Sequence, residues 1–168
     1  VEDLVAAVMV NAPTHAEELT WQMGRPARFA GGELAGFADR AATMIRLAPE
    51  ALAPVEPPPK AGFRRFITHE PVGPVLILAP WNYPWLCAVN TLVPALVAGN
   101  SVIIKHSDQT PLVAERITQA ATAAGLPGGL VQHLHVSHAL TADIVADPRI
   151  AYVAFTGSVG GRRAVHAA

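Results

Sequence analysis

With 168 residues, of which 51% are hydrophobic, the chain has enough apolar mass for one sizeable core. Its net charge of -1 argues against nucleic-acid binding, because no basic excess is present to neutralise phosphates. The single cysteine excludes an internal disulfide and fits a reducing, cytoplasmic compartment, and no apolar stretch reaches the ~18 residues of a membrane helix.

The first third of the chain has the pattern of helices. Residues 2–24 mix apolar and acidic side chains and close on Gly24, a typical helix stop, so we expect one helix there. Residues 31–52 predict a second, amphipathic helix, with Leu34, Phe37 and Ala41 at helical spacing. A proline-rich connector, APVEPPPKAG, follows over 53–62, where neither a helix nor an interior strand is expected.

From residue 63 onward, short apolar runs alternate with helical segments. Strands are expected over 63–70, 74–78, 101–105, 131–136 and 150–157. Helices are expected over 84–100, 110–129, 137–148 and 158–168, and Pro94 predicts a kink or a break in the first of them. This alternation predicts an α/β fold with a parallel, doubly wound sheet and right-handed crossovers.

Polar side chains follow each buried strand, at the edge where doubly wound folds bind their ligands. They are Trp81 and Asn82 after the first strand, Lys105 to Asp108 after the second, Ser137 and His138 after the third, and Thr156 to Ser158 after the fourth. Because parallel strands all end at one edge of their sheet, the topology predicts that these residues are neighbours.

Each of these groups has two interpretations when it is taken by itself. Gly157 and Ser158 form a strand-to-helix turn that suits either a plain helix N-cap or a phosphate site. Lys105 and Asp108 could hold ribose hydroxyls, or they could form a solvated charge pair. Asn82, on a turn stiffened by prolines, could donate to an oxyanion or bond its own backbone.

Two further motifs carry less weight. His133 and His135 would share one face of a strand, with His138 beyond it, but no Cys, Asp or Glu nearby in the sequence completes a set of metal ligands. We therefore predict no metal site. Cys87 lies in an apolar helix with no histidine close in sequence, which predicts a buried and unreactive thiol.

Four segments, in their order and spacing, closely resemble the aldehyde dehydrogenase superfamily: EPVGPVLILAPWNYPW, LVPALVAGNSVIIKHSDQTPL, AAGLPGGLVQ and DPRIAYVAFTGSVGGRR. The resemblance runs from about residue 24 to the chain end and is most specific over 70–111 and 150–163. It implies a Rossmann-like, aldehyde dehydrogenase-like fold in truncated form. Residues 1–60 would hold the N-terminal helices and the connector, and residues 61–168 a partial NAD-binding domain, with the catalytic domain absent.

The resemblance also implies roles for individual residues. Asn82 would donate its side-chain amide to the oxyanion of a thiohemiacetal, and Trp81 with the strand end before it would wall the nicotinamide side. Lys105 would bind the adenosine ribose, and Asp108 stands where the family usually has a glutamate. An acid there would repel a 2′-phosphate, which favours NAD over NADP as the cofactor. The cofactor-binding residues implied are Leu78, Pro80, Trp81, Lys105, Ser107, Asp108, Gly157 and Ser158, the last two beside the pyrophosphate.

The family's reaction also needs a cysteine nucleophile and a glutamate base. Both normally lie downstream, in a Glu-Leu-Gly-Gly segment and a later cysteine-containing loop, and Cys87 matches no catalytic position. The sequence starts at Val1 rather than Met and stops at Ala168. We therefore expect a fragment of an enzyme that oxidises an aldehyde to a carboxylic acid, inactive by itself.

Other interpretations of the whole chain remain open. A non-catalytic nucleotide-binding or interaction module derived from the same fold is the alternative. A plain Rossmann dehydrogenase is disfavoured, because GxGxxG is absent after the first strand. Residues 63–70 resemble strands through which family members oligomerise, so the complete protein is expected to be a homo-oligomer.

Overall fold

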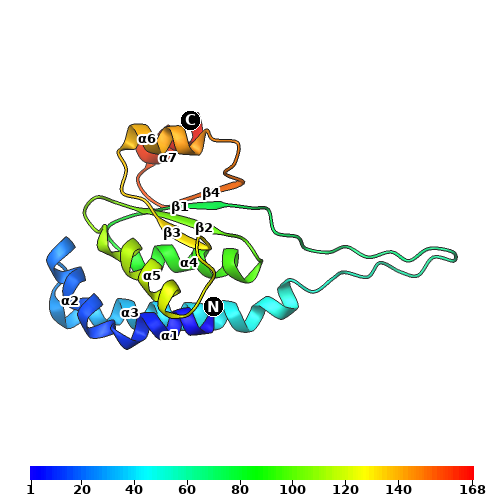
Figure 1. Ribbon diagram of the computed structural model, residues 1–168, viewed down its shortest axis with the longest axis horizontal. Helices are drawn as coiled ribbons and strands as arrows, with labels where there is room; N and C mark the ends of the chain where they lie inside the picture. The colour runs from blue at the N-terminus through cyan, green and yellow to red at the C-terminus, as the bar shows by residue number, and fades with distance from the viewer.

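A four-stranded parallel sheet organises the chain, and the computed structural model describes all residues from 1 to 168 (Figure 1). Its strands are β1 (Val75–Ala79), β2 (Val102–His106), β3 (Val131–His133) and β4 (Tyr152–Phe155), in the order β3-β2-β1-β4. In register, Val75 of β1 lies opposite Val102 of β2 and Tyr152 of β4. The strand order reverses beside β1, so the predicted parallel, doubly wound α/β fold is confirmed.

Helices cover both faces of this sheet. On one face lie α4 (Pro84–Val97) and α5 (Leu112–Ala123), and on the other lie α6 (His138–Val145) and α7 (Val159–Ala167) (Figure 1). All five residues of β1 are buried, which is why its sequence VLILA is apolar throughout rather than alternating. A transmembrane helix is not among these elements, because none combines the necessary length with sufficient hydrophobicity.

Three N-terminal helices pack below α4 and α5: α1 (Glu2–Val10), α2 (Ala12–Met23) and α3 (Ala27–Ala51) (Figure 1). Residues of these helices and of the sheet belong to one continuous hydrophobic core. At its centre the buried Trp85 of α4 stacks on His15 and meets Phe37 edge-on, with ring centroids 5.1 and 5.5 Å apart. The N-terminal helices therefore support the element that follows the first buried strand.

The helical boundaries differ from the predicted ones for reasons of proline chemistry. The single helix expected over 2–24 is two helices, because Pro13 in the first turn of α2 has no N–H to continue the pattern from α1. Gly24 ends α2 in the left-handed conformation, with φ of 76°, as expected of a helix stop. Of the kink or break predicted at Pro94, the break does not occur, because α4 continues through this residue to Val97.

The prediction of a strand over 63–70 is wrong. Residues 52–74 form an extended arm that projects from the body, with only two isolated bridges, Val55 to Ile67 and Lys60 to Phe63 (Figure 1). No third segment lies beside the arm, so its residues have no sheet to join. The third strand is also shorter than the expected 131–136, although the Leu134 N–H still donates to the Ile104 carbonyl at 2.9 Å.

Candidate functional site

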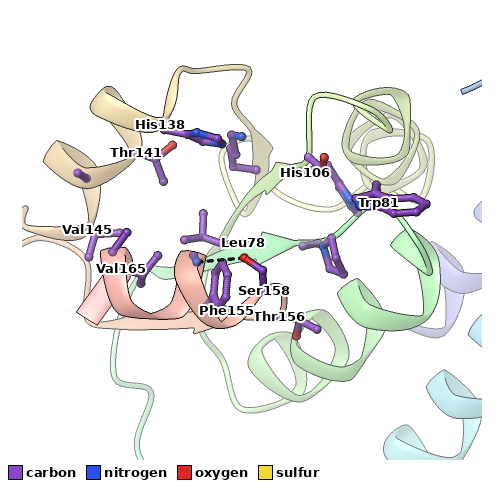
Figure 2. A pocket seen from close by; sticks show the side chains of 18 of the residues that line it. Leu78, Trp81, His106, His138, Thr141, Val145, Phe155, Thr156, Ser158 and Val165 are labelled. Carbon is purple, nitrogen blue, oxygen red and sulfur yellow. Dashed lines mark hydrogen bonds between the residues drawn. The ribbon is translucent and has the colours of Figure 1, made fainter. Parts of the chain in front are cut away.

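A cavity of about 550 Å³ lies at the carboxyl ends of β1, β2 and β4, and residues of α6 and α7 line its other side (Figure 2). It lies where the strand order reverses, the usual place for a ligand in this kind of sheet. The topology brings most of the predicted site residues together here. Those lining the cavity are Leu78, Pro80, Trp81, Asn82, Lys105, Ser107, Gly157 and Ser158, while Asp108 lies outside the lining.

The electrostatics of this cavity suit an anionic ligand. Lys105 is the only lysine or arginine in the lining, and no Asp or Glu belongs to it. The Lys105 side chain is only 9% exposed, and its Nζ lies 3.2 Å from Oδ1 of Asp108, which is 78% exposed. Because Lys105 is buried, the two residues do not form the solvated charge pair that was one of the two interpretations from the sequence. Helix α7 begins at the same cavity, and its free N–H groups add positive potential there.

The turn after β4 is shaped by an aromatic ring. Ser158 caps α7, its Oγ accepting from the Gly161 N–H at 3.1 Å (Figure 2). A left-handed backbone does not explain the glycine at position 157, since its φ does not fall in that region. A Cβ at Gly157 would instead stand 2.6 Å from Cζ of Phe155, and one at Gly161 would stand 2.7 Å from it. Both glycines therefore make room for the Phe155 ring.

Asn82 is exposed and lines the cavity, and its side-chain amide makes no hydrogen bond within the chain. The alternative of a turn asparagine bonded to its own backbone is therefore not what the structure shows. Its carbonyl oxygen accepts from Arg25, whose guanidinium also lies 4.4 Å from the centroid of the Tyr83 ring. The turn is held through its backbone, and the amide of Asn82 is left free to donate to a ligand.

Glu33 anchors this turn from below, and the sequence analysis did not single it out. Its side chain is fully buried, and Oε1 accepts from the N–H of Trp85 at 2.8 Å and of Leu86 at 3.4 Å. N–H groups in the first turn of a helix have no partner within the helix, and α4 has no side-chain cap at its N-terminus, so Glu33 supplies the missing acceptor. The other carboxylate oxygen pairs with Arg25.

The surroundings of Glu33 have opposing effects on its charge. Burial raises the pKa of the Glu33 carboxyl, and Arg25 and the two backbone donors partly offset this. A signal for Glu33 did exist in the sequence, because it precedes Phe37 by four residues and so shares the apolar face of its helix. The structure shows that an acidic residue on that face connects α3 to the Asn82 turn.

His106 is a second residue from which the sequence analysis drew nothing. It ends β2, lines the cavity and is almost fully buried, and neither ring nitrogen has a hydrogen-bond partner. Burial, with the neighbouring Lys105 and His135, lowers the pKa of His106 to about 3. The imidazole is therefore neutral and offers one donor and one acceptor beside the cavity.

The lining contains no cysteine. The only thiol of the chain, Cys87, is half-buried in α4, and burial raises its pKa, with the Glu33 carboxylate adding to the effect. A raised pKa lowers the thiolate fraction, so this side chain is a poor nucleophile. The thiol is thus half-buried rather than buried as expected, and its lack of reactivity stays a prediction.

Comparison with known proteins gives a consistent picture. The family model described as "Aldehyde dehydrogenase family" matches residues 1–168. A phenylacetaldehyde dehydrogenase of Pseudomonas fluorescens is 41% identical over 102 residues, which are 60% of this chain and 20% of that protein. The succinate semialdehyde dehydrogenase Sad of Escherichia coli K12, named for NAD(P)+, is 30% identical over 165 residues, or 98% of this chain and 36% of that protein.

Solved structures agree on the fold. The crystal structure of succinate-semialdehyde dehydrogenase from Burkholderia pseudomallei superposes with a TM-score of 0.89 at 27% identity, covering 99% of this chain and 36% of that one. The chain thus spans about a third of the length of the relatives that match nearly all of it.

Proposed function

The chain belongs to the aldehyde dehydrogenase family, and on that premise we propose that it forms the nicotinamide-dinucleotide site and the oxyanion-binding amide of an enzyme that oxidises an aldehyde to a carboxylic acid. The observation that carries this proposal is the cavity at the reversal of strand order, with a buried lysine, a helix N-terminus and no carboxylate in its lining. These are features that suit a pyrophosphate.

A dinucleotide fits the residues present. The α7 N-terminus with Gly157 and Ser158 would hold the phosphates, since backbone N–H groups and a hydroxyl are donors that phosphate oxygens accept. Lys105 would donate to an adenosine ribose hydroxyl, and Asp108, which it pairs with, would accept from one. An acid at this position disfavours a 2′-phosphate, so we propose NAD rather than NADP.

The remaining wall of the cavity suits the other end of the cofactor. Leu78, Pro80 and Trp81 would form an apolar wall for the nicotinamide ring, and Ser107 would complete the set of contacts. Bound there, NAD would supply the hydride acceptor that aldehyde oxidation needs.

The amide of Asn82 would act on the substrate's oxygen. Its N–H groups are unengaged, and a neutral donor stabilises charge that develops in the transition state without adding charge beforehand. Arg25 and Glu33 would act as positioning residues, because they fix the backbone of the turn rather than touch the substrate. Loss of one such oxyanion donor costs ~10²–10³ in rate.

We infer that the chain does not catalyse the oxidation by itself. Covalent aldehyde chemistry requires a nucleophile, and no cysteine lines the cavity. With NAD and a panel of aldehydes, we expect no NADH formation above a no-enzyme control by absorbance. Steady turnover would contradict the inference.

Cofactor choice is tested by thermal stability. A ligand present at a hundred times its Kd stabilises the folded state by ~2.7 kcal/mol. We expect NAD to raise the melting temperature and NADP to raise it less, and we expect the order to reverse in Asp108→Asn if that acid sets the preference. An equal response to both nucleotides in the unmodified chain would refute the assignment to Asp108.

A non-catalytic nucleotide-binding module is the second candidate. One observation favours it, namely that the cavity is formed by residues of this chain alone although no cysteine lines it. If the chain is such a module, we expect it to bind NAD tightly without turnover. Weak binding would favour the first candidate, a part of an enzyme whose cofactor site is completed by other residues.

We also propose that a second copy of the chain packs on the extended arm over 52–74. The arm exposes several large apolar side chains to solvent, namely Val55, Phe63, Phe66, Ile67 and Val72. Exposed apolar groups in such number are typical of protein interfaces. Sedimentation velocity would reveal a dimer or larger species, and replacing Phe63 and Phe66 by serine should shift it to monomer. A monomer at all concentrations would contradict the proposal.

A further inference from the structure

We propose that Glu115, His133 and His135 form a binding site for a divalent transition-metal ion such as Zn²⁺, separate from the nucleotide cavity. One possible ligand atom from each residue lies within 4.8 Å of those from the other two. From the sequence no carboxylate was expected to complete a set with these histidines. The fold supplies one, because α5 brings Glu115 to His135 from 20 residues away.

The three side chains come from two packed elements. His133 ends β3, and the Leu134 N–H continues the hydrogen bonding to β2, so His135, two residues on from His133, lies beside it with ring centroids 5.1 Å apart. Glu115 lies in the first turn of α5, the helix that packs against β3. Helix α5 covers the face of the sheet opposite α6 and α7 (Figure 1), and it is these two helices that line the nucleotide cavity.

Hydrogen bonds fix the tautomer of His133. The Thr118 hydroxyl donates its only proton to the Ala114 carbonyl oxygen at 3.0 Å, so its contact of 3.1 Å with Nδ1 of His133 is one that it accepts. The neutral imidazole therefore carries its proton on Nδ1 and presents a lone pair on Nε2. A ligating histidine is usually held in this way, with the second nitrogen donating to a neighbour.

Glu115 and His135 already approach as two ligands of one ion would. Nε2 of His135 lies 2.9 Å from Oε1 of Glu115, at hydrogen-bond distance. Two ligands at about 2.0–2.1 Å from a zinc ion lie roughly 3 Å apart, so the ion can bind both atoms with little movement. The side chain of His135 is 41% exposed and that of Glu115 is 31% exposed, so solvent can reach the site and water can fill the open ligand positions.

The set of donors selects the class of metal. Two imidazoles with one carboxylate suit Zn²⁺, Ni²⁺ or Cu²⁺, whereas Ca²⁺ and Mg²⁺ prefer oxygen ligands throughout. Zn²⁺ has no strong geometric demand and accepts a water as its fourth ligand, so it fits a site with three protein ligands on an open surface.

The test is a zinc titration of the untagged 168-residue chain in competition with a chromophoric chelator. We expect one Zn²⁺ per chain and binding at least tenfold weaker in His133→Asn, His135→Asn and Glu115→Gln. Thr118→Val should weaken binding by ~10-fold or more, because it removes the partner that orients His133. The matched control is His69→Asn, an exposed histidine on the arm, which should bind as the unmodified chain does.

A second readout ties the ion to the folded site. Zn²⁺ should raise the melting temperature of the unmodified chain and of His69→Asn, but not of His135→Asn or Glu115→Gln, and Ca²⁺ should leave all four unchanged. Circular dichroism checks that each variant is folded before titration. Absence of zinc binding, unchanged affinity in the ligand variants, or binding without a rise in melting temperature would each overturn the proposal.

Discussion

Replacing Glu33 by glutamine tests whether a buried carboxylate holds the turn that carries Asn82. The Glu33 side chain is fully buried, accepts from the N–H groups of Trp85 and Leu86 at 2.8 and 3.4 Å, and pairs with Arg25. Glutamine keeps one carbonyl oxygen for these donors. It removes the negative charge, however, so the Arg25 guanidinium is left facing a neutral amide.

The expected loss of folding free energy is about 3 kcal/mol. Removing one partner of a buried ion pair costs ~3–5 kcal/mol, and the 12% exposure of the Arg25 side chain keeps the value at the low end. The two backbone bonds become neutral ones, which are weaker by about 1 kcal/mol at most, and the longer one contributes least. For a chain of this length 1 kcal/mol corresponds to roughly 2–4 °C, so the melting temperature should fall by roughly 6–12 °C.

The assay is urea unfolding followed by far-ultraviolet circular dichroism. Glu50→Gln, at an exposed position on the same helix, is the matched control and should change stability by less than ~0.5 kcal/mol. Arg25→Met, alone and with Glu33→Gln, completes a double-mutant cycle in which we expect a coupling of at least about 1 kcal/mol. A loss under ~1 kcal/mol for Glu33→Gln, or strictly additive effects, would refute the reasoning.

Three further predictions concern residues that line the cavity. The pKa of His106 is lowered from 6.5 to about 3, so the folded state favours the neutral ring. The neutral ring's contribution to the stability of the protein is therefore full above pH 6.5 and is lost as the pH falls towards 3. The free energy of unfolding, measured by urea titration, should therefore fall by about 1.4 kcal/mol more per pH unit below 6.5 than in His106→Gln; parallel profiles would contradict this. Gly157→Ala should force the Phe155 ring into the cavity and weaken NAD binding at least tenfold, while Gly31→Ala, where a Cβ meets nothing, should leave binding unchanged. Asn82→Ala should alter stability by less than ~0.5 kcal/mol in calorimetry, because its amide bonds nothing in the chain; a larger loss would indicate a structural role.

The sequence predicted the sheet well because buried parallel strands have a pattern of their own. Runs such as VLILA over 75–79 are apolar at every position, and helical segments separate them, so the parallel pairing and the shared carboxyl edge followed. The arm over 63–70 shows the limit of this approach. Its side chains favour a strand, but a strand also needs a neighbour, and no periodicity shows whether one is present.

Contacts between distant segments could not be predicted either, because a pattern along the chain does not show which segments pack together. Glu33 and Trp85 are 52 residues apart, and Glu115 and His135 are 20 apart, so only the packing of α3 on α4 and of α5 on β3 brings them together. The steric cause of Gly157 was also hidden, since a glycine in a turn is as readily explained by backbone freedom as by an aromatic neighbour. Local pattern predicted where the site lies, and tertiary contacts determine how it is held.

The most direct test of the nucleotide site is calorimetric titration of NAD into the folded, monodisperse 168-residue chain. We predict saturable binding of one NAD per chain, weakened at least tenfold in Lys105→Ala and unchanged in Lys60→Ala. Lys60 is the only other lysine of the chain and lies exposed on the arm, far from the cavity lining. Absence of binding to the folded chain, or equal affinity in Lys105→Ala, would contradict the assignment of this cavity to the cofactor.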